Sequence, residues 1–155
     1  ILFEDASDGY KKKTIGKDAF TQEITGGFGQ YLKYEEDNTT SSTTSGTYQT
    51  KLTLTTDNLI ESRYRVGYKG SLTNSKKNGA VDYRVIIDGT TVADEGTYQP
   101  PDDNIYGLFT GFYYIDLLAG IHTVEIQYRR NGNQGTASIR NARLEFFRAE
   151  STKIN

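Results

Sequence analysis

YYIDLLAGIHTVEIQYRRNGNQGTASIRNARL, residues 113–144, is the stretch that decides the fold of this chain. Between residues 123 and 129, the apolar side chains of Val124, Ile126 and Tyr128 alternate with polar ones. This period of two is typical of a strand with one buried face. A tight turn at Leu118–Gly120 precedes the strand and a loop rich in Gly and Asn follows it. The stretch therefore predicts three consecutive strands.

The last of these strands changes phase. Its apolar residues stand first on odd and then on even positions: Ala137 and Ile139, then Ala142, Leu144 and Phe146. A regular strand cannot keep both sets on one face. One extra residue near Arg140 and Asn141 restores a single apolar face, so we predict a β-bulge or bend there.

The turn followed by GIHTVEIQYR, the Gly-rich loop and GTASIRNARLEFF resembles the closing strands of jelly-roll domains in bacteriophage virion proteins. Such domains occur in tail fibres, head fibres and capsid decoration proteins. The matching residues are Gly120, His122, Thr123, Gln127, Gly135, Thr136, Ser138, Ile139 and Asn141–Leu144. They cover roughly the last quarter of the chain. The resemblance implies an all-β, antiparallel jelly-roll (TNF/C1q-like) β-sandwich, and it is diagnostic of fold more than of function.

Composition agrees with this fold class. The 155 residues suit one domain and include 12 Tyr and 16 Gly but only 2 Pro and no Trp. We expect an N-terminal arm or connector over residues 1–27, the sandwich over 28–150 and a frayed tail over 151–155. The DASDG and KKKT segments of the arm resemble connectors of phage fibre and tail proteins, which implies contact with other virion proteins. A solvated face is the alternative interpretation of Lys11–Lys13.

Several classes of function are disfavoured by composition. The absence of Cys excludes disulfides and thiolate sites. A net charge of −2 gives no electrostatic footprint for nucleic acid, and no apolar run approaches the ~20 residues that span a bilayer. The chain also lacks Met and a signal-peptide pattern. We expect a processed chain or, more in keeping with the resemblance, a piece of a longer polypeptide.

Four further strands are predicted over residues 47–55, 63–69, 81–87 and 90–95 by the same alternation. Their expected inward residues are Tyr48, Leu52, Leu54, Tyr64, Val66, Tyr68, Val81, Tyr83, Val85 and Ile87. Lys51 is expected to point outward. Residues 35–46 are polar and low in complexity, and we expect a mobile surface loop in which the acidic Glu35, Glu36 and Asp37 either hold a cation or are simply solvated.

Residues 96–107, GTYQPPDDNIYG, form the candidate recognition loop. Both prolines lie here, and they stiffen a loop that has aromatic residues at its rim. The candidate residues are Tyr98, Pro100, Pro101, Asp102, Asp103 and Tyr106. A loop that merely packs on its own sheet is the alternative.

Residues 108–118, LFTGFYYIDLL, are apolar on both parities. A half-exposed strand normally has one polar face, so either helices or loops of this chain or another subunit must cover the second apolar face. Because few residues are suited to helices, we expect a second subunit. The candidate interface residues are Phe109, Phe112, Tyr113 and Tyr114. The resemblance implies a homotrimer around an axis lined by such aromatic faces.

We find no catalytic centre in the sequence. The single histidine, His122, would be needed for a triad or a metal site, and a structural role at a strand entry is the simpler interpretation. We therefore expect no enzyme activity, no cofactor and no metal. The leading hypothesis is a trimeric structural domain on the surface of a phage particle, contacting host glycans or proteins. A monomeric carbohydrate-binding module is the alternative, while a glycan-cleaving fibre enzyme is disfavoured by size and the lack of an acid pair.

Overall fold

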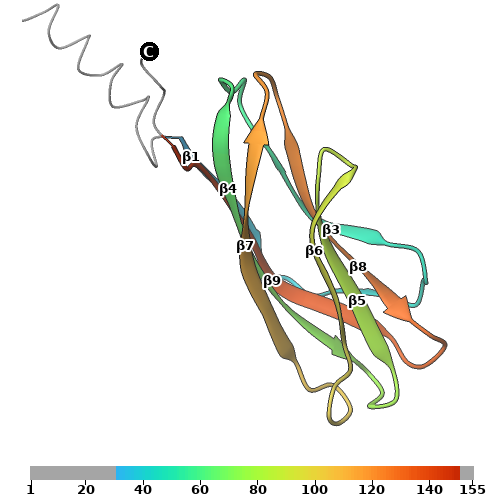
Figure 1. Ribbon diagram of the computed structural model, residues 1–155. Coiled ribbons are helices and arrows are strands. Elements are labelled where there is room, and N and C mark those ends of the chain that lie inside the picture. The colour runs from blue at the N-terminus through green and yellow to red at the C-terminus, as the bar shows by residue number, and fades with distance from the viewer. Residues whose placement is uncertain (1–30, 151–155) are drawn as a thin grey trace, which may run out of the picture.

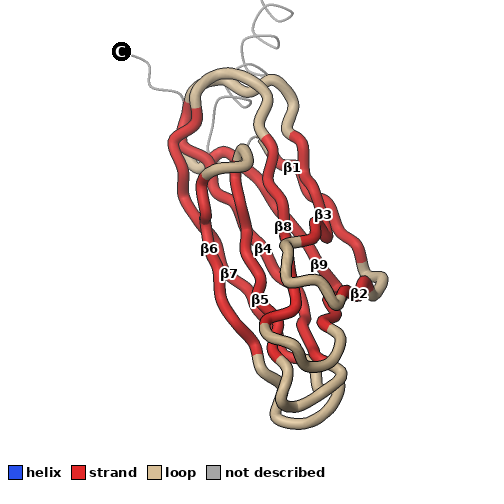
Figure 2. The backbone as a smooth tube through the Cα atoms, turned by 90° about the vertical axis from the view of Figure 1, so that its right-hand side faces the viewer, coloured by secondary structure: helices blue, strands red, loops and turns tan. Residues whose placement is uncertain are grey.

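The computed structural model describes residues 31–150, all in strands, turns and loops without a helix (Figure 2). No helix in this part of the chain could therefore cross a membrane. The expected arm over residues 1–27 and the expected tail over 151–155 lie outside the described residues. Within residues 31–150 the strands are β1 (Leu32–Asp37), β2 (Ser41–Thr43), β3 (Gln49–Thr55), β4 (Ser62–Asn74), β5 (Ala80–Ile87), β6 (Thr91–Tyr98), β7 (Gly107–Leu117), β8 (Thr123–Asn131) and β9 (Ala137–Arg148).

The strands form two antiparallel sheets that lie face to face (Figure 1). One sheet has the order β1-β9-β4-β7, with β2 pairing on β9, and the other has the order β3-β8-β5-β6. Apart from the step from β1 to β2 and the β5–β6 hairpin, every connection crosses from one sheet to the other. This order is that of a jelly roll, so the predicted fold class is confirmed.

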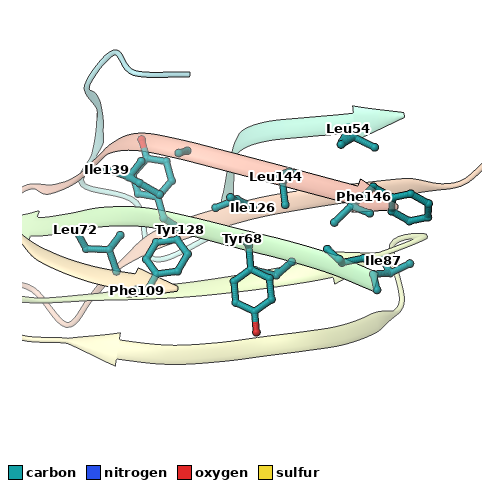
Figure 3. Packing of buried hydrophobic residues seen from close by; sticks show 14 of the residues in the cluster. Leu54, Tyr68, Leu72, Ile87, Phe109, Ile126, Tyr128, Ile139, Leu144 and Phe146 are labelled. Carbon is teal, nitrogen blue, oxygen red and sulfur yellow. The ribbon is translucent and has the colours of Figure 1, made fainter. Parts of the chain in front are cut away.

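The core fills the space between the sheets (Figure 3). Phe146 of β9 stacks on Tyr64 of β4 with ring centroids 5.2 Å apart. Across the sandwich, Phe109 of β7 stacks on Tyr83 of β5 at 4.2 Å. These aromatic pairs contribute both buried apolar area and favourable ring geometry. The predicted alternation of β4, β5 and β8 is confirmed, because Val66, Val85, Val124 and the other apolar residues of that parity face this core.

The predicted bulge in β9 is confirmed. Lys69 of β4 pairs with Arg143, whereas Ser71 pairs with Arg140, so β9 contains one more residue than β4 between these two pairs. Asn141 takes the left-handed conformation there, with φ of 54°. The extra residue brings Ile139 and Leu144 onto the same buried face in spite of their opposite parity.

The prediction for β3 was partly wrong, because a second bulge lies in this strand. Thr50 pairs with Gln127 and Leu52 pairs with Ile126, which leaves Lys51 as the extra residue. Lys51 is buried, contrary to the expectation that it points outward. Tyr48 is turned to the outer face, where the guanidinium groups of Arg84 and Arg129 lie 4.1 and 4.4 Å from its ring centroid.

The prediction of one continuous loop over residues 35–46 was also wrong. β1 extends to Asp37, and Ser41–Thr43 form β2, which pairs with β9. Two of the three acidic residues are held by cations of the protein itself: Asp37 lies 3.1 Å from the Lys51 ammonium group and Glu36 lies 2.6 Å from the Arg143 guanidinium. Among residues 31–150 no group of three His, Cys, Asp or Glu side chains is placed to hold a metal ion.

Candidate functional site

The outward side of the β1-β9-β4-β7 sheet carries most of the exposed aromatic side chains, and we call it the aromatic face. Its members follow from the pairing register, because residues opposite one another share a face. Across the sheet, Tyr34 of β1 pairs with Glu145, Glu145 pairs with Gly67, and Gly67 pairs with Phe112 of β7. The aromatic face consists of Leu32, Tyr34, Glu36, Arg65, Gly67, Lys69, Leu108, Thr110, Phe112, Tyr114, Arg143, Glu145 and Phe147.

The candidate interface residues divide between the two sides of β7. Phe112 and Tyr114 lie on the aromatic face, with their rings 5.7 Å apart in an edge-to-face arrangement. Tyr113 faces the core and is half-buried, and Phe109 is buried against Tyr83. Phe109 and Tyr113 therefore belong to the core of this chain and not to its outer surface. Leu108, which the sequence did not single out as a candidate, joins Phe112 and Tyr114 in an exposed row along β7.

A hollow of about 260 Å³ opens on the aromatic face above Gly67. Gly67 sits at the centre of the sheet between Glu145 and Phe112 and contributes no side chain. The hollow is lined by Arg65, Gly67, Tyr68, Lys69, Thr110, Gly111, Arg143, Glu145 and Phe147. An interior glycine weakens a strand, and one of its uses is to let a ligand approach the backbone closely.

Three cations, Arg65, Lys69 and Arg143, and the carboxylate of Glu145 line this hollow. Arg143 is held in place because its guanidinium donates to Glu145 at 2.8 Å and to Glu36 at 2.6 Å, and these bonds raise its pKa above the ordinary value. Arg65 is different: its guanidinium lies 4.2 Å from the ring centroid of Phe112 and 5.4 Å from that of Phe147. Its buried Nε–H finds no acceptor within residues 31–150. The site thus combines fixed positive charge with apolar ring surface.

The candidate recognition loop is anchored rather than free. Its backbone is tied to the β4–β5 turn, since Asn104 N–H donates to the Asn74 carbonyl at 3.0 Å and Lys77 N–H donates to Asp103 at 2.7 Å. Both segments lie at the lower end of the molecule in Figure 1. The loop therefore has a defined shape that is set by its neighbours.

The aromatic residues of this candidate site do not project freely. Tyr98 ends β6, and its hydroxyl donates to the Ile105 carbonyl at 3.1 Å. Tyr106 is half-buried beneath Arg140, whose guanidinium lies 3.6 Å from the ring centroid. Pro100 is buried, while Pro101, Asp102 and Asp103 are exposed. The exposed part of this loop thus combines the polar Asp102 and Asp103 with Pro101 and Ile105, and its role in recognition stays a prediction.

His122 occupies a closed hydrogen-bonded position at the entry to β8. Its Nδ1 lies 2.6 Å from an Asp88 carboxylate oxygen, and its Nε2 lies 2.8 Å from the Leu118 carbonyl oxygen. Burial lowers the pKa of His122, but the bonds to Asp88 and Leu118 outweigh it and the net shift is upward. Both ring nitrogens are engaged in holding two loops together, which is a structural role.

Sequence reasoning missed the hollow, although one signal pointed to it. Gly67 interrupts the alternation of RYRVGYK at an outward position. A glycine in the interior of a predicted strand suggests a bulge or a close approach. The partners that complete the site, Phe147 and Thr110, lie far away in the chain and are brought in only by the pairing of β9 and β7 with β4.

Comparison with known proteins supports the jelly-roll fold and nothing beyond it. No protein-family model matches the sequence, and no curated protein matches it. Among solved structures, the chain is similar to VP2 of infectious bursal disease virus in a subviral particle, with 13% identity, a TM-score of 0.50, and 77% of this chain and 33% of VP2 covered. VP2 of the Gt strain of that virus gives 11% identity, a TM-score of 0.50 and coverage of 77% and 34%.

This chain therefore spans about a third of the VP2 chains that it matches. A CBM36-1 domain of a multidomain xylanase from the hindgut metagenome of Trinervitermes trinervoides gives 9% identity, a TM-score of 0.44 and coverage of 80% and 100%. That likeness is too loose to distinguish one β-sandwich from another. The similarity to VP2 places the chain among jelly-roll β-sandwiches.

Proposed function

We propose that this chain is a non-enzymatic structural component of a bacteriophage virion. In this proposal it forms a homotrimeric domain of fibre or capsid-decoration type, exposed on the particle surface and in contact with the host. The sequence resemblance to phage virion proteins and the jelly-roll fold shared with VP2 of a subviral particle support it. Attachment to other virion proteins through residues 1–27 is part of the same proposal.

The observation that carries the proposal is the exposed apolar row along β7. Leu108, Phe112 and Tyr114 are 69%, 54% and 49% exposed, and they lie on the same side of an edge strand, with Thr110 between Leu108 and Phe112. An apolar edge strand invites association unless it is covered, and soluble monomers rarely leave contiguous apolar patches open. Three copies of this chain that pack these rows around one axis would bury them in a closed, symmetric assembly.

Light scattering on the purified chain tests the trimer. A mass of three times 17.4 kDa is expected, and the double substitution Phe112→Ser and Tyr114→Ser is expected to reduce it to 17.4 kDa. Tyr34→Ser is the matched control, because Tyr34 is also 54% exposed on the aromatic face but lies on β1, at the opposite edge of the sheet. A monomeric parent protein, or a trimer that the double variant leaves intact, would contradict the proposed interface.

The second candidate function is a monomeric carbohydrate-binding module. The hollow above Gly67 favours it, because a concave site with convergent polar groups beside an aromatic ring is the usual form of a small-ligand site. A 17.4 kDa monomer that binds sugar would place this candidate first.

A further inference from the structure

We infer that the hollow above Gly67 binds a sugar that carries a carboxylate. This sugar would be an acidic monosaccharide unit of a surface glycan. This inference rests on the glycan contact named in the proposed function. A single chain builds the whole hollow, although its lining residue Thr110 lies in the β7 row that borders the proposed trimer interface. It also moves that contact from the loop over residues 96–107 to the aromatic face.

The hollow is lined by three cations, Arg65, Lys69 and Arg143, and by one carboxylate, that of Glu145, which leaves an excess of positive charge for an anion. Arg143 is shared by Glu145 and Glu36, whereas Arg65 and Lys69 have no acidic partner among the described residues. The Nε–H of Arg65 also finds no acceptor in residues 31–150, but this atom is buried, so a ligand would meet the terminal nitrogens of the guanidinium. Its guanidinium is held between Phe112 and Phe147, so the fork is already oriented before a ligand arrives. A planar guanidinium fixed in this way matches the two oxygens of a carboxylate.

Gly67 supplies the space that such a ligand needs. A Cβ atom at this position would lie 3.7 Å from Cβ and 4.0 Å from the carboxylate Oε1 of Glu145, which are ordinary contacts, and the backbone of Gly67 is not in the left-handed region. Neither close packing nor backbone conformation therefore requires glycine at this position. A side chain there would instead fill the hollow, and the lack of one in mid-strand is otherwise a loss of stability.

The walls and the size of the hollow suit one sugar ring. Phe147 offers an apolar surface at one end, while Thr110, Lys69 and Arg143 offer polar groups at the other. This combination of an apolar face and polar groups matches a pyranose, which has C–H faces and hydroxyl edges. At about 260 Å³ the hollow lies below the range of drug-sized pockets, so it fits a single residue of a glycan and not a longer segment.

Titration followed by amide NMR spectra tests the inference with D-glucuronic acid as the probe. Saturable shifts are expected at Gly67, Lys69 and Thr110, with a dissociation constant in the range of roughly 1–10 mM that weakens as salt is added. D-Glucose tests the need for the carboxylate, and propionate tests the need for the ring. Equal binding of glucose, or equal binding of propionate, would overturn the assignment to a carboxylated sugar.

Two substitutions locate the binding. Gly67→Thr fills the hollow with the side chain of a good strand former, and Arg65→Gln removes a cation that has no acidic partner within residues 31–150. We expect each substitution to weaken binding of D-glucuronic acid about tenfold or more. Arg84→Gln is the matched control, since Arg84 also lies over an aromatic ring, that of Tyr48, but on the other sheet. No saturable binding by the parent protein, or binding that Gly67→Thr leaves unchanged, would overturn the inference. Light scattering on the same samples reports the trimer separately, so failure of one proposal is not mistaken for failure of the other.

Discussion

The Nζ atom of Lys51 lies 3.1 Å from Oδ2 of Asp37, and the Lys51 side chain is completely buried. The ammonium group also donates to the Thr39 carbonyl at 2.8 Å and to the Ser41 hydroxyl at 2.9 Å. A buried lysine is tolerated only when its three donors find acceptors, and here they do. The bulge in β3 thus fastens the connection between β1 and β2 to the opposite sheet.

Substitution of this lysine is expected to lower the free energy of unfolding. Lys51→Met keeps most of the buried volume but removes the ammonium group from Oδ2 of Asp37 and from the Thr39 carbonyl, which we expect to cost about 2 kcal/mol. Urea denaturation measures the effect. Lys69→Met, at an exposed lysine, is the control and is expected to change stability by less than about 0.5 kcal/mol. Equal effects of the two substitutions would show that the buried ammonium group does not stabilise the fold.

The same contact predicts a loss of stability in acid. Hydrogen bonds from Thr39, followed by the interaction with Lys51, lower the pKa of Asp37 from 3.8 to about 2. Because the folded-state pKa lies below the unfolded one, this contribution is present above pH 3.8 and is lost as the pH falls towards 2. Melting temperatures of the parent protein and of Asp37→Asn, measured across this window, should converge as the pH decreases. A constant difference between them would contradict the prediction.

His122 predicts a second pH dependence of opposite sign. Its pKa is raised above 6.5, since the bonds to Asp88 and the Leu118 carbonyl outweigh the effect of burial. Its contribution is therefore complete below pH 6.5 and is lost as the pH rises through the folded-state pKa. His122 is the only histidine of the chain, so NMR titration of its ring reads this pKa directly. Asp88→Asn should lower the value, and a parent pKa at or below 6.5 would rule out the charged bridge.

Much of the fold is predictable from local pattern, and most of the candidate site is not. Alternation correctly predicts the inward residues of β4, β5 and β8, because each of these strands keeps one face in the core over its whole length. It fails for Tyr48 and Lys51 because the bulge in β3 has no signature: a polar Thr50 fits either register. The hollow depends on an absent side chain at Gly67 and on residues from three strands that only the sheet order brings together.

A contact between distant parts of the chain also makes Gly135 less tolerant of substitution than Gly132. Gly132 and Gly135 both have positive φ, of 80° and 67°, but a Cβ at Gly132 would meet nothing within 4 Å. A Cβ at Gly135 would collide with the side chain of Asn74, which is fully buried and donates to the Gln134 carbonyl at 3.1 Å. Asn74 also receives the Lys76 N–H at 2.9 Å. Its side chain thus joins two loops at one end of the sandwich and has no room to withdraw.

Gly132→Ala is expected to cost about 1 kcal/mol, from backbone strain alone. Gly135→Ala is expected to cost about 3 kcal/mol or more, because the displaced Asn74 loses buried hydrogen bonds as well. Thermal and urea unfolding of the two variants give the comparison, with the parent as reference. Similar losses for both would mean that the loops adjust around Asn74 at little cost, and that this end of the molecule is less rigid than its bonds suggest.

The bulge in β9 allows the clearest separation of backbone from side-chain effects. Asn141 is exposed, so substitution removes little packing, yet its φ of 54° lies in the region that β-branched residues avoid. Asn141→Gly is expected to leave stability within about 0.5 kcal/mol of the parent, whereas Asn141→Val is expected to lower it by about 2 kcal/mol. Unfolding in urea measures both. If Asn141→Val were as stable as Asn141→Gly, β9 would have to pair with β4 without a bulge at this position. Ile139 and Leu144 could not then share one buried face, and the phase change that first indicated the bulge would need another explanation.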